Sequence, residues 1–374
     1  MPDFRRVIQA AVCLAFLSAV PLAPAVSARA QSKLEIKDLK GRSVTLAKPP
    51  QRMLIDDGRY LVALSLIHPN PPSLLAGWPR DINRIGDRAY QGFVKKFPEL
   101  EKVPQVASSA GTFSLERALA VKPDVAIFTL GLGPSAEEVA QLESAGVPVI
   151  FIDFFSQPFE NLEPSLRILG RLTGRETQAE SFIAYRRTHM ERISGALKGA
   201  KNLQRPKVFL EAHAGMSDDC CNSPGKGNIG DYIDFVGGHN IGADVLPKSF
   251  GKLNLEYVVA QNPPIYIATG GPHLEKAGGL VVGPGYTPER ARAALTKVAG
   301  RPGIATLSAV TSGRVFGLSH QLLNSPLDLL AVESLAKWIH PELFAKLDPE
   351  QTLTDMNRNF LSVPLEGTYW ISLR

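Results

Sequence analysis

Short apolar runs alternate along the chain with longer segments in which apolar residues recur at helical spacing. Four of these runs predict buried strands: RMLIDDG from Arg52, VPVIFID from Val147, KVFLEAH from Lys207 and GRVFGLS from Gly313. Strands that alternate with helices form parallel sheets with helices on their faces. The pattern therefore predicts an α/β fold.

Two segments that lie 140 residues apart resemble each other without a gap. They read SLERALAVKPDVAIFTLG from Ser114 and NLEYVVAQNPPIYIATGG from Asn254. Each predicts a short amphipathic helix, a turn that contains proline, and an apolar strand that ends in threonine and glycine. Helix-turn-strand units of this kind occur in many α/β proteins, so a chance similarity is the alternative. The identical residues at equivalent positions of the two segments favour two lobes with the same construction.

The segment from Glu176 to Ala200 contains no proline and predicts one long helix between the lobes. Its apolar stripe recurs at helical spacing and consists of Phe182, Tyr185, His189, Ile193 and Ala196. A helix of this length is a stiff connector rather than a flexible linker. We therefore expect an N-terminal lobe at 31–157, a helical connector at 158–204 and a C-terminal lobe at 205–374.

Residues 1–30 have the layout of a cleavable export signal. Arg5 and Arg6 form a basic head, an apolar run follows, and small residues precede a cleavage site after Ala30. A membrane anchor is the alternative, but the strongest part of the run, from Val7 to Val20, is short for a span. We expect a periplasmic protein, exported by the general or the twin-arginine route.

The net charge argues against a nucleic-acid partner. The formal charge of +5 includes Arg5, Arg6 and Arg29 against Asp3, which leaves +3 after removal of the signal. This excess is too small for a nucleic-acid-binding surface.

With Cys13 inside the signal, the cysteines that remain are the adjacent pair Cys220 and Cys221. An oxidising compartment favours a disulfide between them that stiffens a loop. Free thiols and direct metal ligation are the alternatives. Ligation is disfavoured because the spaced Cys-x-x-Cys pattern is missing.

Open parallel sheets bind ligands beyond the carboxyl ends of their strands, so the residues that follow each predicted strand are the candidate ligand-binding residues. In the first lobe the residues after strands are Asp56, Asp57, Arg59 and Tyr60, the segment with Trp78 and Arg80, and TLGLG from Thr129. Of these, the candidate ligand-binding residues are Arg59, Tyr60, Trp78 and Arg80. In the second lobe they are His213, Cys220, Cys221, His273, His320 and Asn324.

The histidines of this set, His213, His273 and His320, follow strands of the same lobe. Neutral imidazole binds metals and also forms hydrogen bonds with a chelate, so the three are candidate metal ligands. The alternative for each is a hydrogen bond to a loop carbonyl.

The candidates of the first lobe have other roles open to them. Arg59 and Arg80 suit carboxylates or catecholates of an anionic ligand, or else they pair with nearby aspartates. Tyr60 and Trp78 offer flat apolar faces to a chelate, or else they belong to the core.

The order of several segments resembles one family. These segments are the export signal, KDLKGRSVTLAKPPQRMLI, FSLERALAVKPDVAIF, the long helix, and HQLLNSPLDLLAVESLAKWIHPELF. Together they look like a periplasmic solute-binding protein of an ABC importer, of the class that carries iron-siderophore complexes, haem or cobalamin. The resemblance covers nearly the whole chain after the signal.

This resemblance implies two α/β lobes bridged by one long α-helix, with a ligand cleft between them. It implies a monomer that binds an iron chelate without catalysis or a cofactor and delivers it to an importer permease. It also implies one acidic docking residue on each lobe, for which Glu137 or Glu138 and Glu275 occupy suitable places. Acidic residues there also favour a helix N-terminus.

Two other functions stay open. The histidines or the cysteine pair would suit an exported metal- or thiol-dependent enzyme, although the sequence contains no H-E-x-x-H, G-x-S-x-G or C-x-x-C motif. The chain would also suit an adaptor protein that has lost its cleft ligand.

Overall fold

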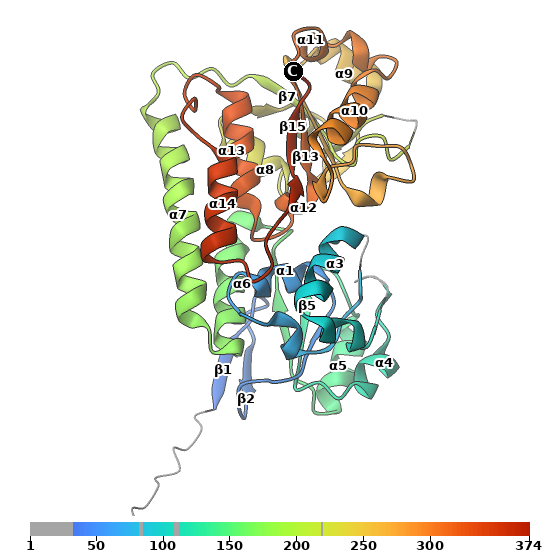
Figure 1. The fold of residues 1–374 in the computed structure, drawn as a ribbon, viewed down its shortest axis with the longest axis vertical. Helices are drawn as coiled ribbons and strands as arrows, with labels where there is room; N and C mark the ends of the chain where they lie inside the picture. Colours follow the sequence, from blue (N-terminus) through green and yellow to red (C-terminus); the bar gives the residue numbers. More distant parts are fainter. Residues whose placement is uncertain (1–32, 82–84, 108–111, 218–219) are drawn as a thin grey trace, which may run out of the picture. The chain divides into compact units, whose positions relative to one another are not determined.

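The N-terminal sheet has four parallel strands in the order β4-β3-β5-β6. Figure 1 shows the sheet, by its labelled strand β5, among the blue to teal helices of the first lobe. Their bounds are Met53–Ile55 for β3, Leu75–Gly77 for β4, Val125–Thr129 for β5 and Val149–Ile152 for β6. Every residue of these strands is buried, as their continuous apolar sequences predict. The flanking helices are α1 (Arg59–Ser65), α3 (Asp87–Lys96), α4 (Leu115–Ala120) and α5 (Ala136–Ser144), with short 3-10 turns at Pro71–Leu74 and Pro98–Lys102.

The computed structural model describes residues 33–81, 85–107, 112–217 and 220–374. The predicted export signal at 1–30 lies outside the described residues. The first strands, β1 (Leu34–Lys37) and β2 (Ser43–Leu46), form an antiparallel hairpin. The N–H of Leu39 in its turn donates to the carbonyl of Phe151 in β6 at 3.0 Å, which joins the hairpin to the first lobe.

The C-terminal sheet has five strands in the order β15-β13-β11-β7-β9. Their bounds are Lys207–Glu211 for β7, His239–Asn240 for β9, Ile265–Gly270 for β11, Val315–Ser319 for β13 and Trp370–Ser372 for β15. The last strand runs antiparallel to β13, and the other pairs are parallel. Two short antiparallel pairs accompany this sheet, β8 (Asn222–Pro224) with β10 (Phe250–Lys252) and β12 (Gly283–Pro284) with β14 (Gly367–Thr368).

The helices of the second lobe are α8 (Gly230–Phe235), α9 (Leu255–Gln261), α10 (Pro288–Ala299), α11 (Ser308–Thr311), α12 (His320–Leu323), α13 (Asp328–Ile339) and α14 (Pro349–Asn359). Short 3-10 turns occur at Ile241–Asp244, Pro272–Leu274 and Ile304–Thr306.

The two similar segments form equivalent units of the two sheets. The side chain of Ser114 caps α4 by accepting from the N–H of Arg117, and that of Asn254 caps α9 by accepting from the N–H of Glu256. The strands that follow are β5, between β3 and β6, and β11, between β7 and β13. Each of these strands therefore has a parallel partner on both sides, which is typical of an all-apolar strand.

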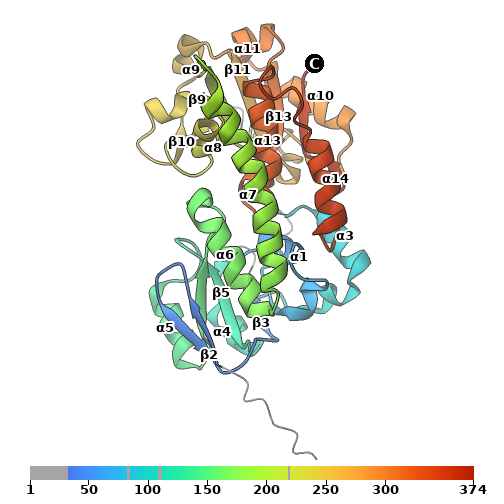
Figure 2. The same cartoon turned by 90° about the vertical axis from the view of Figure 1, so that its left-hand side faces the viewer.

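The predicted long helix is α7, Glu176–Gly199, with 24 residues. Figure 2 shows α7 running past helices of both lobes, beside α6 (Pro158–Thr173) and α13. A buried ion pair fixes it, because Arg186 donates through Nε and Nη2 to the carboxylate of Asp328 at 2.8 and 2.6 Å. The α/β fold with two helix-flanked parallel sheets and one long bridging helix is thus confirmed.

The chain returns to the first lobe after α14. The N–H of Ser362 donates to the carbonyl of Ser65 at the end of α1, at 2.8 Å. The segment between α14 and β14 therefore touches both lobes, next to the connector helix. The predicted lobe boundaries stay a prediction.

Candidate ligand-binding site

The strands β7, β11 and β13 are each followed closely by a histidine. His213 comes two residues after β7, His273 lies in the 3-10 turn after β11, and His320 directly follows β13. The three strands are parallel neighbours in the sheet. Because their carboxyl ends lie at the same edge, the three imidazoles come from separate parts of the sequence to one place.

The ring of His213 contacts the rings of both other histidines. Nδ1 of His213 and Nε2 of His273 lie 2.8 Å apart, and the two rings are close to perpendicular, with centroids 4.9 Å apart and an interplanar angle of 80°. The rings of His213 and His320 lie closer, with centroids 3.9 Å apart. The predicted convergence of the three histidines is what the structure shows.

Thr269, near the end of β11, joins two of these histidines. Its hydroxyl oxygen accepts from the backbone N–H of His213 at 3.2 Å and lies 2.9 Å from Nδ1 of His320. Its carbonyl accepts from the N–H of Ala214 at 2.8 Å. These bonds hold His213 in the left-handed region, with φ at 53°, where residues other than glycine are uncommon.

The histidine cluster is uncharged at neutral pH. Burial, with a smaller effect of His273, lowers the pKa of His213 to about 4. Burial also lowers the pKa of His273, and it lowers the pKa of His320 well below its usual range. A neutral imidazole has one N–H donor and one lone pair, so the cluster offers donors and acceptors without net charge.

Polar atoms at this edge have no hydrogen-bond partner within the described part of the chain. They are Nδ1 of His273, the hydroxyl of Ser319 and Oδ1 of Asn324. Ser319 is 0 % and Asn324 4 % exposed. Buried polar atoms without partners are uncommon in proteins, and these mark positions where a ligand or ordered water can bond.

The arrangement suits hydrogen bonding better than a metal site made of protein groups alone. Among the residues that the structure describes, no group of three or more His, Cys, Asp or Glu side chains is placed to hold a metal ion. The contact between His213 and His273 uses one imidazole lone pair for a hydrogen bond. Direct ligation by the three histidines stays a prediction.

On the first lobe, Arg59 at the start of α1 forms a buried ion pair with Asp57, through Nε at 3.0 Å and Nη2 at 2.6 Å. This is the alternative role that the sequence left open for Arg59. Its charge is the smallest of the causes that lower the pKa of His320, after burial, His213 and His273.

Beside it, Asp56 is a buried carboxyl that the list of candidates did not include. It accepts from the N–H and the hydroxyl of Thr129 at 2.9 and 3.1 Å, and burial raises its pKa to about 7. Thr129 also bonds the hydroxyl of Tyr60 at 2.6 Å. In the sequence, the adjacent aspartates after the first predicted strand were the signal that could have indicated this site. The raised pKa of Asp56 depends on burial by distant segments, which a local sequence pattern does not predict.

Two aromatic candidates belong to the core instead. Trp78 is 0 % exposed and stacks on Tyr90 of α3, with centroids 6.0 Å apart. Tyr60 is 3 % exposed and meets Phe154 edge-on. The structure thus gives Tyr60 and Trp78 the core position that the sequence left open for them, and a ligand-facing role stays a prediction.

Arg80 has a backbone partner. Its Nη2 donates to the carbonyl of Glu101 at 2.8 Å, and its guanidinium lies over the ring of Tyr90. Its role in binding an anionic ligand stays a prediction.

Cys220 and Cys221 are joined by a disulfide, the arrangement that we favour from the sequence. Cys221 is 0 % exposed, and its carbonyl accepts from the N–H of Leu253 at 2.9 Å. The next residue, Asn222, accepts from the N–H of Ala212, which precedes His213. The disulfide thus lies in a loop attached to the histidine site, and its sulfurs are not available as thiolate ligands.

Comparison with known proteins agrees with this architecture. The sequence matches the family described as "Periplasmic binding protein" over residues 73–322. The chain belongs to this family.

The solved structure of the TroA-like periplasmic binding protein FepB from Veillonella parvula is similar, with 25 % identity and a TM-score of 0.81 over 91 % of this chain and 100 % of that one. The molybdate-bound MolA from Haemophilus influenzae has the same fold, with 17 % identity and a TM-score of 0.69 over 89 % and 99 % of the two chains. A cobalamin-binding protein from Halobacterium salinarum is 30 % identical over 130 residues, which are 34 % of this chain and 33 % of the relative. The chain therefore matches about a third of that curated relative.

The three predicted docking glutamates differ in the contacts that they form. Glu137 of α5 is exposed, whereas Glu138 forms a capping box with Ser135. The carboxylate of Glu275 accepts from the hydroxyl of Tyr286 at 2.9 Å and from Arg290. Docking by Glu137, Glu138 and Glu275 stays a prediction. None of the helices described here has the length and apolar character that a membrane span requires.

Proposed function

We propose that this protein captures an iron-siderophore complex or a similar metal chelate between its lobes and delivers it, without catalysis, to the permease of an ABC importer. The observation that carries the proposal is the uncharged cluster of His213, His273 and His320, which has an unpaired buried nitrogen at Nδ1 of His273. Membership of the periplasmic binding protein family supports capture rather than chemistry.

The polar groups near the cleft suit a chelate. Imidazoles without charge bond carbonyl, hydroxamate or catecholate oxygens, and they can complete the coordination of a metal that the chelate already holds. Arg59 is already paired with Asp57, so these two residues together add no net charge. The burial of these groups strengthens each hydrogen bond that the ligand forms.

Delivery requires contact with the permease in the periplasm. Glu137 and Glu275 are exposed acidic residues on the first and second lobes, and they would meet basic residues of the permease. The export signal at 1–30 supports the periplasmic location. We expect Glu137→Ala with Glu275→Ala to lower uptake by cells while the affinity for the chelate stays unchanged.

A corrinoid is the second candidate. The partial similarity to a cobalamin-binding protein favours it, because about a third of each chain is aligned at 30 % identity. A neutral imidazole also suits cobalt as a ligand. Corrinoids absorb visible light strongly, so the absorbance of the natively purified protein distinguishes the two candidates.

The experiment is purification of the mature protein from the periplasm of its native host, followed by native mass spectrometry and metal analysis. We expect a metal and an organic chelator in equal amounts, released unchanged. A chemically altered product after incubation would indicate an enzyme. Protein that carries no organic ligand, and that shows no fluorescence change with ferric chelates, would contradict the proposal.

A further inference from the structure

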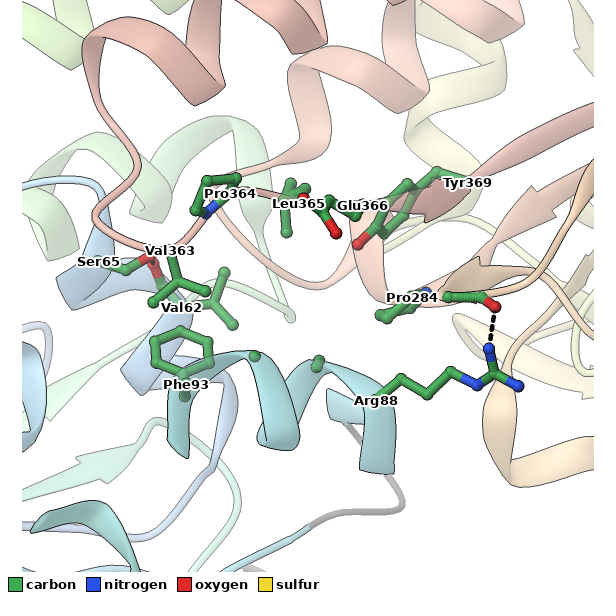
Figure 3. A pocket seen from close by; sticks show the side chains of 13 residues that line it. Val62, Ser65, Arg88, Phe93, Pro284, Val363, Pro364, Leu365, Glu366 and Tyr369 are labelled. Carbon is green, nitrogen blue, oxygen red and sulfur yellow. Dashed lines mark hydrogen bonds between the residues drawn. The ribbon is translucent and has the colours of Figure 1, made fainter. Parts of the chain in front are cut away.

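A cavity of about 220 Å³ lies beside the candidate site, between the two lobes (Figure 3). Val62 of α1 and Phe93 of α3 line it from the first lobe. Val363, Leu365 and Tyr369 line it from the chain after α14. Its walls are therefore mainly hydrocarbon.

Two polar side chains of the lining, Ser65 and Arg88, are already bonded to backbone oxygens, and a third, Glu366, is exposed to solvent. The hydroxyl of Ser65 donates to the carbonyl of Val62 at 2.7 Å. Arg88 of α3 donates through Nη1 to the carbonyl of Gly285, across the two lobes. Because these donors are in use, an occupant would gain mainly from burial of apolar surface.

This cavity is next to the histidine cluster. A second cavity, of about 180 Å³, shares Arg88 and Pro284 with the first and is also lined by His273. Arg88 and Pro284 therefore form the wall that the two cavities share, and a chain that reaches from His273 into the apolar cavity displaces the Arg88 side chain from the carbonyl of Gly285.

Gly92 keeps part of the cavity open. It lies inside α3, where glycine weakens a helix relative to alanine. A Cβ atom at this position would meet Val363 Cγ1 at 3.7 Å, which is an ordinary contact. Packing against neighbours therefore does not require glycine here, and a larger side chain at residue 92 would fill the space.

We propose that the cavity binds a hydrocarbon arm, an alkyl or acyl chain, of the same ligand whose polar part is held at the histidines. Whole small-molecule ligands generally occupy about 300 to 1,000 Å³, so a cavity of about 220 Å³ suits part of a ligand. The inference rests on the proposed function and narrows the ligand to a chelate that carries an apolar chain.

The test uses iron-free alkyl hydroxamic acids with chains of increasing length, from acetohydroxamic to octanohydroxamic acid, titrated into the mature protein by calorimetry. Each methylene that enters the cavity raises affinity about fourfold. We expect this increase in the native protein and its loss in Gly92→Phe, with affinity for acetohydroxamic acid unchanged. Ala89→Leu, which also narrows the cavity, serves if Gly92→Phe does not fold.

The matched control is Gly195→Phe on α7, where a Cβ atom meets nothing within 4 Å. This variant keeps the chain-length dependence of the native protein. Affinity independent of chain length, no binding of octanohydroxamic acid up to its solubility limit, or the same dependence in Gly92→Phe would overturn the inference. Chain-length dependence without binding of any ferric chelate would leave the cavity assignment standing and contradict the proposed function instead.

Discussion

Nδ1 of His213 lies 2.8 Å from Nε2 of His273, although 60 residues separate them in sequence. Both residues follow parallel strands that are neighbours in the C-terminal sheet, β7 and β11. A hydrogen bond between two imidazoles requires that one of them accept through a lone pair, so at least one of the pair is neutral. The hydrogen bond that holds these two rings together therefore forms only while at least one of them is uncharged.

The first prediction concerns the charge of His213. Its pKa of about 4 means that the ring stays almost entirely neutral between pH 8 and pH 5. We expect its ring proton signals in NMR to stay constant over this range and to shift only near pH 4. A midpoint near the ordinary histidine pKa of about 6.5 would contradict the burial of the cluster.

The second prediction concerns Asp56, whose pKa is raised to about 7. Between its ordinary pKa and this value, the folded state keeps a proton that the unfolded state has lost. This contribution to stability is present at low pH and is lost as pH rises through 7.

Asp56→Asn stays neutral at every pH and keeps one acceptor for Thr129. We expect the free energy of unfolding of the variant, relative to the native protein, to rise by about 3 kcal/mol between pH 5 and pH 8. Titration of the histidines changes the free energy of unfolding of both proteins by the same amount, so this effect cancels in the comparison. Urea denaturation at the two pH values measures the difference, and an unchanged difference would show that Asp56 does not titrate between pH 5 and pH 8.

The third prediction concerns the ion pair between the connector helix and α13. Asp328 is fully buried and also accepts from the hydroxyl of Tyr232 at 3.1 Å. Arg186→Met leaves its carboxylate without the charged partner, which costs about 3–5 kcal/mol for a buried pair.

Arg167→Met is the control, because Arg167 pairs with Glu180 at the exposed surface. A surface pair contributes about 0–1 kcal/mol. Urea denaturation compares the two variants with the native protein. Equal losses in both would mean that the Arg186 pair does not hold the connector helix more firmly than a surface contact does.

The fourth prediction concerns the disulfide. Because Cys220 and Cys221 are adjacent, the bond closes no intervening chain, and its loss should change global stability by less than about 1 kcal/mol. We expect Cys220→Ser with Cys221→Ser to keep the fold but to speed proteolysis in the attached loop. Intact mass of the native protein should lack the two thiol hydrogens. Identical proteolysis of both proteins would exclude a stiffening role.

Local patterns were sufficient for most of the fold. The strands at Met53–Ile55 and Val315–Ser319 consist mainly of apolar residues, and α7 has a long proline-free sequence with an apolar stripe. Thr129 and Thr269 are equivalent residues of the two similar segments, and each bonds a residue that follows a neighbouring strand. Thr129 bonds Asp56, and Thr269 bonds His213. Convergence of the histidines follows from the common edge of parallel strands.

The first-lobe part of the site was less predictable. A position after a strand does not determine exposure, because segments from elsewhere in the chain decide it. Tyr90 of α3 covers Trp78, and Phe154 covers Tyr60. The apolar cavity could not be predicted for the same reason, because its lining residues Val62 and Val363 come from distant parts of the sequence.

The most direct measurement of the central claim is the affinity for the chelate that copurifies with the protein. The variant with His213, His273 and His320 all replaced by alanine is compared with His239→Ala, at the opposite end of the sheet, where His239 pairs with Lys207 at the start of β7. The account predicts a loss of roughly 10- to 1,000-fold in the triple variant, because each of three lost hydrogen bonds contributes about 0.5–1.5 kcal/mol and about 1.4 kcal/mol corresponds to a factor of ten. Native affinity is expected in His239→Ala. Native affinity in the triple variant, with the fold intact by circular dichroism, would contradict the assignment of the histidines as the ligand site.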